Sequence, residues 1–201
     1  MNIYPKSLEE LISFYSKLPG VGSKSAERFA LATLNFSEDE INDASKILLN
    51  AKMKLKKCPI CGILTDQDIC NICSNENRKK NLICVVEDYK SALAMEKIGT
   101  FKGVYHVLDG LISPIDGVGA EDINLAPLVS RINNLSNVEL ILALKGTIEG
   151  ETTTLYIKKI FSDKNVLISR LSYGLPIGAD LEYLDMLTLD KAFNDRKKIS
   201  D

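Results

Sequence analysis

Four short apolar runs in the second part of the chain constrain its fold more than any other feature. They are rich in Val, Ile and Leu, and they lie at 81–87, 103–109, 138–144 and 165–171. Segments with the apolar spacing of helices separate them. Runs that are apolar on both faces and alternate with helices are typical of a parallel sheet covered by helices. We therefore expect an α/β domain with a mainly parallel sheet.

The N-terminal region has a different pattern, because its apolar residues recur every three or four positions. Ser7 stands where an N-cap is expected, and Ser37 followed by Glu40 has the capping-box pattern that opens a helix. Helices are expected at 7–17, 23–34 and 38–57. The first 57 residues are thus predicted to be all-helical, and a helix-prone stretch at 180–193 predicts a helical C-terminal segment. The fold class is an α+β chain of several modules.

A glycine-rich turn, LPGVGSKSAER, joins the first two expected helices at 18–28. Its glycines, lysine and hydroxyl side chains are typical of a phosphate-binding loop. The phosphate could belong to a nucleotide or to the backbone of a nucleic acid. A Walker A loop reads G-x-x-x-x-G-K-[ST] and follows a strand. Here Lys24 is preceded by Ser23, and the segment before the turn is an amphipathic helix. The spacing and the context therefore exclude this kind of nucleotide site.

Two helices joined by Gly-hydrophobic-Gly are typical of a helix-hairpin-helix, whose second helix presents unpaired amides to a backbone phosphate. Gly20 and Gly22 permit a positive φ and a close approach of the backbone. Lys24 and Arg28 are four residues apart, on one helix face, and add positive charge. Such contacts hold DNA without reading its bases. The alternative is an ordinary core hairpin with a glycine C-cap.

Charge is distributed unevenly along the chain, although the net charge is only −2. Residues 44–80 contain eight basic side chains and three acidic ones. A basic segment in an otherwise acidic chain suits an anionic partner bound at one end. For Lys52 to Lys57 taken alone, a solvated helix face is an equally good explanation.

Four of the five cysteines form two C-x2-C pairs separated by eight residues. Two such turns can direct four thiolates at one ion, which closes a tetrahedral zinc site with no open position. We expect one structural zinc ion per chain. A redox role is the alternative, but a thioredoxin-like context is missing. The ligands are expected to be Cys58, Cys61, Cys70 and Cys73. Cys84 is predicted to be a buried core thiol, and His106 a packed or hydrogen-bonded residue.

Long motifs follow one another in the order LPGVGSKSAERFA, CPIC…CNIC, ICVVE, YHVLDGLISPIDGVG, TIEGE and YGLPIGADLEY. In this order the chain resembles the bacterial RecR family of recombination mediators over nearly its whole length. The resemblance implies a helix-hairpin-helix region, a C4-type zinc finger, a Toprim domain and a C-terminal segment that makes an oligomer contact. Their expected bounds are 1–57, 58–73, 81–175 and 176–201.

The resemblance also implies a function. Members of the family bind DNA without sequence specificity in recombinational repair and have no catalytic activity of their own. They act with RecO, and in some settings RecF, to load RecA onto single strands, and they form homo-oligomers from dimers to tetrameric rings. No apolar run is long enough for a membrane span, and the N-terminus does not resemble a signal peptide. We expect a cytoplasmic protein associated with the nucleoid.

Catalytic Toprim enzymes hold divalent cations with a Glu after the first strand and Asp-x-Asp after a later one. Glu87 fits the first position, but Lys145-Gly146 follows the later strand, where the family commonly has Asn-Pro. Glu149 and Glu151 come next, at an expected helix start. These three Glu residues are candidates for a partner or divalent-cation site. A metal-dependent, DNA-cleaving or primase-like enzyme remains the alternative function, and a pure protein adaptor is a third.

Overall fold

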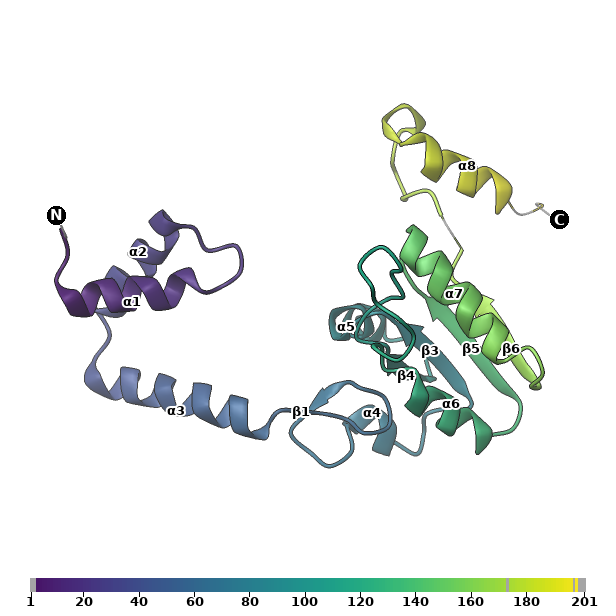
Figure 1. The fold of residues 1–201 in the computed structure, drawn as a ribbon, viewed down its shortest axis with the longest axis horizontal. Helices are drawn as coiled ribbons and strands as arrows, with labels where there is room; N and C mark the ends of the chain where they lie inside the picture. The colour runs from purple at the N-terminus through teal and green to yellow at the C-terminus, as the bar shows by residue number, and fades with distance from the viewer. Residues whose placement is uncertain (1–2, 173, 197, 199–201) are drawn as a thin grey trace. The chain divides into compact units, whose positions relative to one another are not determined.

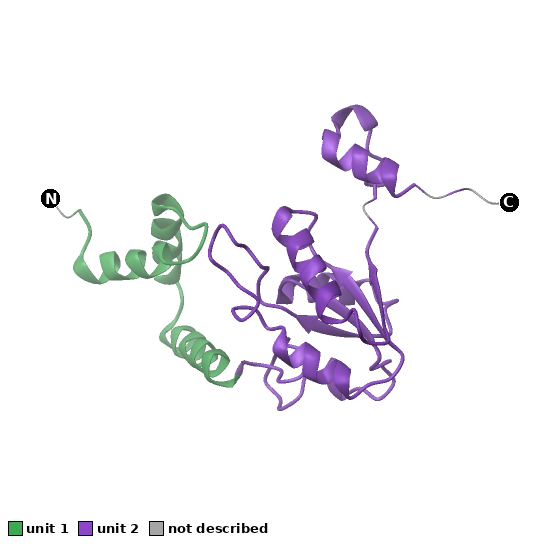
Figure 2. Cartoon of the chain, turned by 45° about the vertical axis from the view of Figure 1, so that its right-hand side comes forward, with its two compact units in different colours: residues 1–54 green, residues 55–201 purple. Residues whose placement is uncertain are grey.

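The computed structural model describes residues 3–172, 174–196 and 198, which form two compact units, 1–54 and 55–201 (Figure 2). Residue 173 of the expected Toprim range, and residues 197 and 199–201 of the expected C-terminal segment, lie outside the described residues. No helix of the described chain is long and apolar enough to cross a membrane.

The first unit contains three helices, α1 (Lys6–Ser16), α2 (Ser23–Thr33) and α3 (Glu38–Lys54). α1 and α2 form a hairpin in which Ala26 and Ala30 of α2 are fully buried. Across the hairpin, the Tyr15 hydroxyl lies 2.6 Å from the Thr33 hydroxyl. The helical prediction for this region is therefore confirmed from α1 to α3.

The first residues of these helices can be compared with the capping residues that the sequence predicts. At α3 the Ser37 amide donates to a Glu40 carboxylate oxygen at 2.8 Å, and the Glu40 amide donates to the Ser37 hydroxyl at 3.3 Å. This reciprocal pair confirms the capping box. At α1 the predicted N-cap Ser7 is wrong, because the helix already begins at Lys6. Pro5 precedes it, and its fixed φ suits the residue that leads into a helix.

The second unit opens with two very short antiparallel strands, β1 (Lys56–Lys57) and β2 (Leu64–Thr65). The all-helical prediction is wrong at these two lysines. The turn at the first cysteine pair reverses the chain, so that residues on either side of it pair as strands. A one-turn helix, α4 (Asn71–Ser74), carries the second cysteine pair.

A four-stranded parallel sheet is the centre of the second unit (Figure 1). Its spatial order is β4-β3-β5-β6, and all three strand pairs are parallel, which confirms the prediction. The strands are β3 (Leu82–Val86), β4 (Val104–Val107), β5 (Val138–Ala143) and β6 (Val166–Arg170). The intervening helices are α5 (Tyr89–Lys97), α6 (Ala126–Asn133) and α7 (Ile148–Ile160).

The two faces of this sheet are covered differently, because successive side chains of a strand point to opposite faces. Ile83 and Val85 face a cluster to which α6 and α7 contribute. Cys84 and Val86 face a second cluster, which contains Ala92 of α5 and all four paired cysteines. The cysteine turns are therefore part of the covering layer of the sheet.

The C-terminal segment contains a 3-10 turn, η1 (Leu181–Tyr183), and the helix α8 (Met186–Asn194). Asp185 caps α8 by accepting the Thr188 amide at 2.9 Å. Lys191 connects α8 to the β5–α7 region by donating to the Gly146 carbonyl at 3.1 Å. No residue of α8 is fully buried, and Leu189 and Ala192 are half-buried.

Candidate functional site

The turn between α1 and α2 gives its two glycines different conformations. Gly20 has φ +77°, which only glycine adopts readily, and the Val21 amide beside it donates to the Leu18 carbonyl at 3.1 Å. Gly22 has φ −78° and is the N-cap of α2. The turn therefore uses the positive φ that glycine permits at Gly20 and not at Gly22. A Cβ at either glycine would meet no atom within 4 Å, so this side of the turn is open.

The start of α2 presents donors and positive charge together. No side chain caps α2, and the amides of Ser23 and Lys24 donate to no other described residue. Lys24 and Arg28 are both exposed, and neither forms an ion pair within the described chain. The Arg28 guanidinium lies 5.5 Å from the centre of the Phe29 ring, on the helix surface. The structure thus brings together the residues that the sequence proposed for a phosphate contact.

Several basic side chains of residues 44–80 are engaged in contacts within the chain. Lys56 pairs with Asp68 at 2.7 Å, and Arg78 pairs with Glu96. The Lys80 ammonium donates to the backbone carbonyls of Cys73 and Asn75 at 2.6 Å each. The charge of this segment therefore stabilises its own fold as well as any contact with an anion.

The four paired cysteines form a compact cluster. Their sulfur atoms all lie within 4.8 Å of one another, and the Cys61 and Cys70 sulfurs are 3.5 Å apart. A tetrahedral ion with Zn–S bonds of about 2.3 Å requires an S–S separation of roughly 3.8 Å. The separations, the all-sulfur donor set and the burial of all four residues fit a structural zinc ion.

The local electrostatics of the cluster also favour a cation. The contact between Cys61 and Cys70 raises the pKa of Cys61 and lowers the pKa of Cys70, because one thiol donates to the other sulfur. The Cys73 amide donates to the Cys70 sulfur at 3.4 Å, which further stabilises a thiolate there. Four thiolates at this spacing repel one another, so a bound cation is needed to keep all four deprotonated.

The cysteine turns are attached to the sheet through backbone contacts. The Val107 amide at the end of β4 donates to the Cys61 carbonyl at 2.8 Å. Gly62 has φ +78°, and a Cβ there would lie 3.1 Å from the Val107 carbonyl oxygen. Lys57 pairs with Asp109 at 2.6 Å, just after β4. The metal centre and the end of the sheet are therefore one connected structure.

Two isolated groups behave as the sequence predicted. Cys84 is fully buried in β3, and burial raises its pKa to about 12, which makes it an inert core thiol. His106 is fully buried in β4, with Nε2 2.6 Å from the Asn124 carbonyl oxygen. Burial lowers the pKa of His106, because the charged imidazolium would lose its hydration.

A cleft of about 400 Å³ lies beyond the ends of the parallel strands. Glu87 follows β3 and Lys145 follows β5, and these strands are neighbours with Val86 opposite Ala143. The Lys145 ammonium lies 2.9 Å from one Glu87 carboxylate oxygen. The other acidic residues that line the cleft are Asp109, Asp116, Asp122 and Glu149.

Glu151 does not line this cleft. It lies near the start of α7, with Arg170 at 3.4 Å and Lys191 of α8 at 3.7 Å. The structure therefore separates the candidate carboxylates, with Glu87 and Glu149 in the cleft and Glu151 beside the C-terminal segment.

Comparison with protein families gives four matches that follow one another along the chain. Residues 8–52 match the helix-hairpin-helix model of RecR, and residues 55–75 match the RecR zinc finger domain, which has four cysteine ligands. Residues 81–172 match the Toprim domain, and residues 174–197 match the C-terminal model of RecR. The chain belongs to the RecR family. RecR membership and the helix-hairpin-helix assign it a DNA-binding role in recombinational repair.

Two contacts of this RecR chain were missed by the sequence reasoning, namely Lys145 with Glu87 and Lys57 with Asp109. The first depends on β3 and β5 being adjacent, although β4 lies between them in sequence. The second joins residues 52 positions apart through the cysteine turn. The contact between Lys145 and Glu87 could have been predicted only from the order of strands in the sheet. No local sequence signal indicates the contact between Lys57 and Asp109.

Proposed function

We propose that this chain is a non-catalytic mediator that binds DNA without sequence preference and, with RecO and in some settings RecF, assists loading of RecA onto single-stranded DNA. The observation that supports this most directly is the start of α2. There, unpaired amides, an open glycine turn and the exposed Lys24 and Arg28 lie together.

DNA binding at this site follows from simple electrostatics. The amides at the start of α2 carry the positive end of the helix dipole and can donate to a phosphate oxygen. Gly22 has no side chain to keep the backbone of the DNA away. Lys24 and Arg28 add two positive charges one helical turn apart. None of these groups selects a base, so binding is independent of sequence.

Cys58, Cys61, Cys70 and Cys73 are the proposed zinc ligands. A bound zinc ion supplies four bonds that close the two cysteine turns, with no position left for catalysis. The side chains keep their thiolate form, while Lys80 and the Cys73 amide hold the second turn in place. The role of the metal centre is therefore structural.

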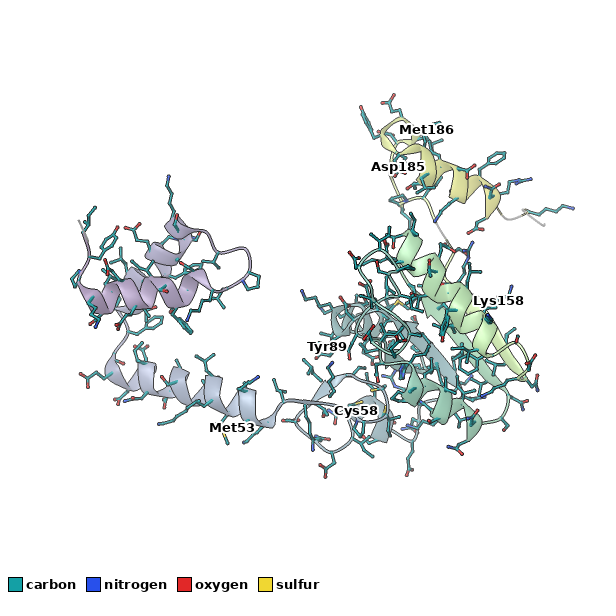
Figure 3. All side chains as sticks on the ribbon, viewed as in Figure 1. Met53, Cys58, Tyr89, Lys158, Asp185 and Met186 are labelled. Carbon is teal, nitrogen blue, oxygen red and sulfur yellow. The ribbon has the colours of Figure 1, made fainter. Side chains whose placement is uncertain are left out.

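Self-association is also proposed, with segment 176–201 as a subunit contact and a cytoplasmic, nucleoid-associated location. α8 exposes several apolar side chains, among them Met186, which is labelled in Figure 3 and is 84% exposed. Phe193 on the same helix is 69% exposed. A second copy of the chain would cover such residues, and a ring of several copies would multiply the number of DNA contacts.

The DNA site is tested with the double variant Lys24→Ala/Arg28→Ala over a salt series. We expect weaker binding to duplex and single-stranded DNA, and a slope of log K against log[salt] that is smaller by about 1 to 2. Lys97→Ala/Lys159→Ala changes the net charge equally at exposed sites of the other unit and serves as the control. Unchanged affinity and slope in the α2 variant would remove these residues from the DNA site.

The mediator role and the enzymatic alternative give different results in two further assays. A mediator increases RecA assembly on strands covered by single-strand-binding protein when RecO is present. A Toprim enzyme instead nicks supercoiled DNA when Mg²⁺ is added, and loses this activity in Glu87→Gln. A magnesium-dependent nick of this kind would contradict the proposal.

A further inference from the structure

The backbone around Lys145 is held in place by the start of α7. Thr147 is the N-cap of α7, and its hydroxyl accepts the Gly150 amide at 3.3 Å. Gly150 packs so closely on the preceding loop that a Cβ there would collide with the Lys145 carbonyl oxygen. The loop after β5 is therefore fixed against the helix, and the position of Lys145 beside Glu87 follows from the fold.

The negative charge of Glu87 is compensated by Lys145. One carboxylate oxygen accepts from the Lys145 ammonium, and the other is buried without a hydrogen-bond partner among the described residues. The Glu87 side chain is 20% exposed, whereas that of Lys145 is 61% exposed. Because a carboxylate largely removed from water needs a cation nearby, loss of the lysine would leave an uncompensated charge.

Three of the four other acidic residues that line the cleft have partners of their own. Asp109 pairs with Lys57 at 2.6 Å, and Asp116 accepts from the Ser113 hydroxyl at 2.6 Å. Asp122 accepts the Gly119 amide at 2.8 Å. Of these three residues only Asp109 has a cation as its partner, and Lys145 is the cation beside Glu87.

We propose that Lys145 is the built-in cation of the Toprim cleft, and that its ammonium group keeps divalent cations away from Glu87. A divalent cation binds carboxylate oxygen at about 2.0 to 2.6 Å, so it would have to displace the ammonium and would be repelled by it. This inference deepens the proposed non-catalytic function of the same cleft. It implies that Glu87 does not coordinate Mg²⁺ in the parent protein.

Removing the ammonium should therefore create a divalent-cation site. The test titrates Mn²⁺ into Lys145→Met and follows the electron paramagnetic resonance signal of free Mn²⁺. We expect at least tenfold tighter binding than in the parent protein, at one site, with competition by Mg²⁺. Lys145→Arg retains the positive charge and should bind no more than the parent.

Two controls separate this site from general charge effects. Lys97→Met makes the same change in net charge at the last residue of α5. Glu87 lies just before the first turn of this helix, so Lys97 is at the opposite end. It should leave Mn²⁺ binding unchanged. Glu87→Gln/Lys145→Met removes the carboxylate as well and should abolish the gained site.

Several outcomes would overturn the inference. These are equally tight Mn²⁺ binding by the parent protein, no gain in Lys145→Met, and a gain that survives removal of Glu87. If Lys145→Met is too unstable at low metal, Mn²⁺ should raise its melting temperature, and failure to do so also refutes the inference. The DNA-binding assay tests α2, which lies in the other unit. If the parent protein binds both DNA and Mn²⁺, this inference is refuted and the proposed DNA-binding function is not.

Discussion

Gly20 and Gly22 lie two residues apart in one turn, and their backbone conformations separate a folding role from a binding role. Gly20→Ala places a Cβ at φ +77° and should lower the free energy of unfolding by about 1 kcal/mol. At Gly22, φ −78° is open to alanine; the weaker N-cap and the lower entropy of the unfolded chain oppose each other, so Gly22→Ala should change this free energy by less than about 1 kcal/mol. If the backbone at Gly22 approaches a phosphate, this second variant should still bind DNA more weakly.

Thermal unfolding and DNA titration of both variants check this prediction. Both measurements are needed for Gly22→Ala. Its thermal unfolding shows whether the variant is folded, so that a loss of DNA affinity can be assigned to the turn. Wild-type DNA affinity in a fully stable Gly22→Ala protein would show that the turn does not approach DNA closely.

His106 provides a pH-dependent contribution to stability. Burial lowers its pKa in the folded state, and Nδ1 is buried without a hydrogen-bond partner among the described residues. The unfolded chain therefore binds a proton more readily, so stability is lost as the pH falls below the unfolded value of about 6.5. We expect His106→Gln to flatten the decrease in unfolding free energy between pH 7 and pH 5.

Denaturant unfolding at several pH values measures this effect. His106 is the single histidine of the chain, so no other imidazole contributes in this range. An equally steep decrease in His106→Gln would assign the pH dependence to other groups, such as protonation of the zinc thiolates.

At the scale of elements, the cysteine turns and the sheet should lose their structure together. Structural zinc in small domains contributes about 10–16 kcal/mol of binding free energy. Cys58→Ser should therefore reduce zinc to well below one equivalent per chain and destabilise the second unit, because the cysteines belong to a core cluster of the sheet.

Thiol titration distinguishes the two classes of cysteine. The four clustered thiols should become reactive when a strong chelator removes the metal. Cys84 should react only after unfolding, because burial raises its pKa to about 12. Rapid reaction of all five thiols in the native, metal-loaded protein would contradict the assignment.

The elements themselves were largely predictable from the sequence. Apolar runs such as LICVV mark strands buried on both faces, and the spacing of Ala26 and Ala30 marks a packed helix face. The pairing of Lys56 and Lys57 as a strand was not predictable, because two polar residues carry no periodic signal. The contact between Glu87 and Lys145 was also hidden, since it depends on which strands become neighbours.

At the scale of the whole molecule, self-association can be tested through exposed apolar residues. Met186 and Phe193 are prominent on α8, and Met53, labelled in Figure 3, is 81% exposed on α3. Light scattering after gel filtration should give a mass that is a multiple of 22.2 kDa. Met186→Ser/Phe193→Asp should lower this mass, since charged and polar groups do not pack in an apolar contact.

Measuring the mass with and without DNA adds a second comparison. A ring that encloses DNA keeps or increases its subunit number when DNA is added. A monomeric mass at every protein concentration, with DNA still bound, would rule out the oligomer proposal.

The shared core of the cysteine turns and the sheet determines how the protein can be dissected. A fragment that begins at residue 81 would contain every strand of the sheet and α5 but would lose the cysteine turns that cover the same face as α5. A fragment of residues 55–201 would keep these turns. Protease cleavage between the two units should therefore leave a resistant C-terminal product that retains its metal, whereas truncation at the start of the Toprim match should yield an aggregating chain.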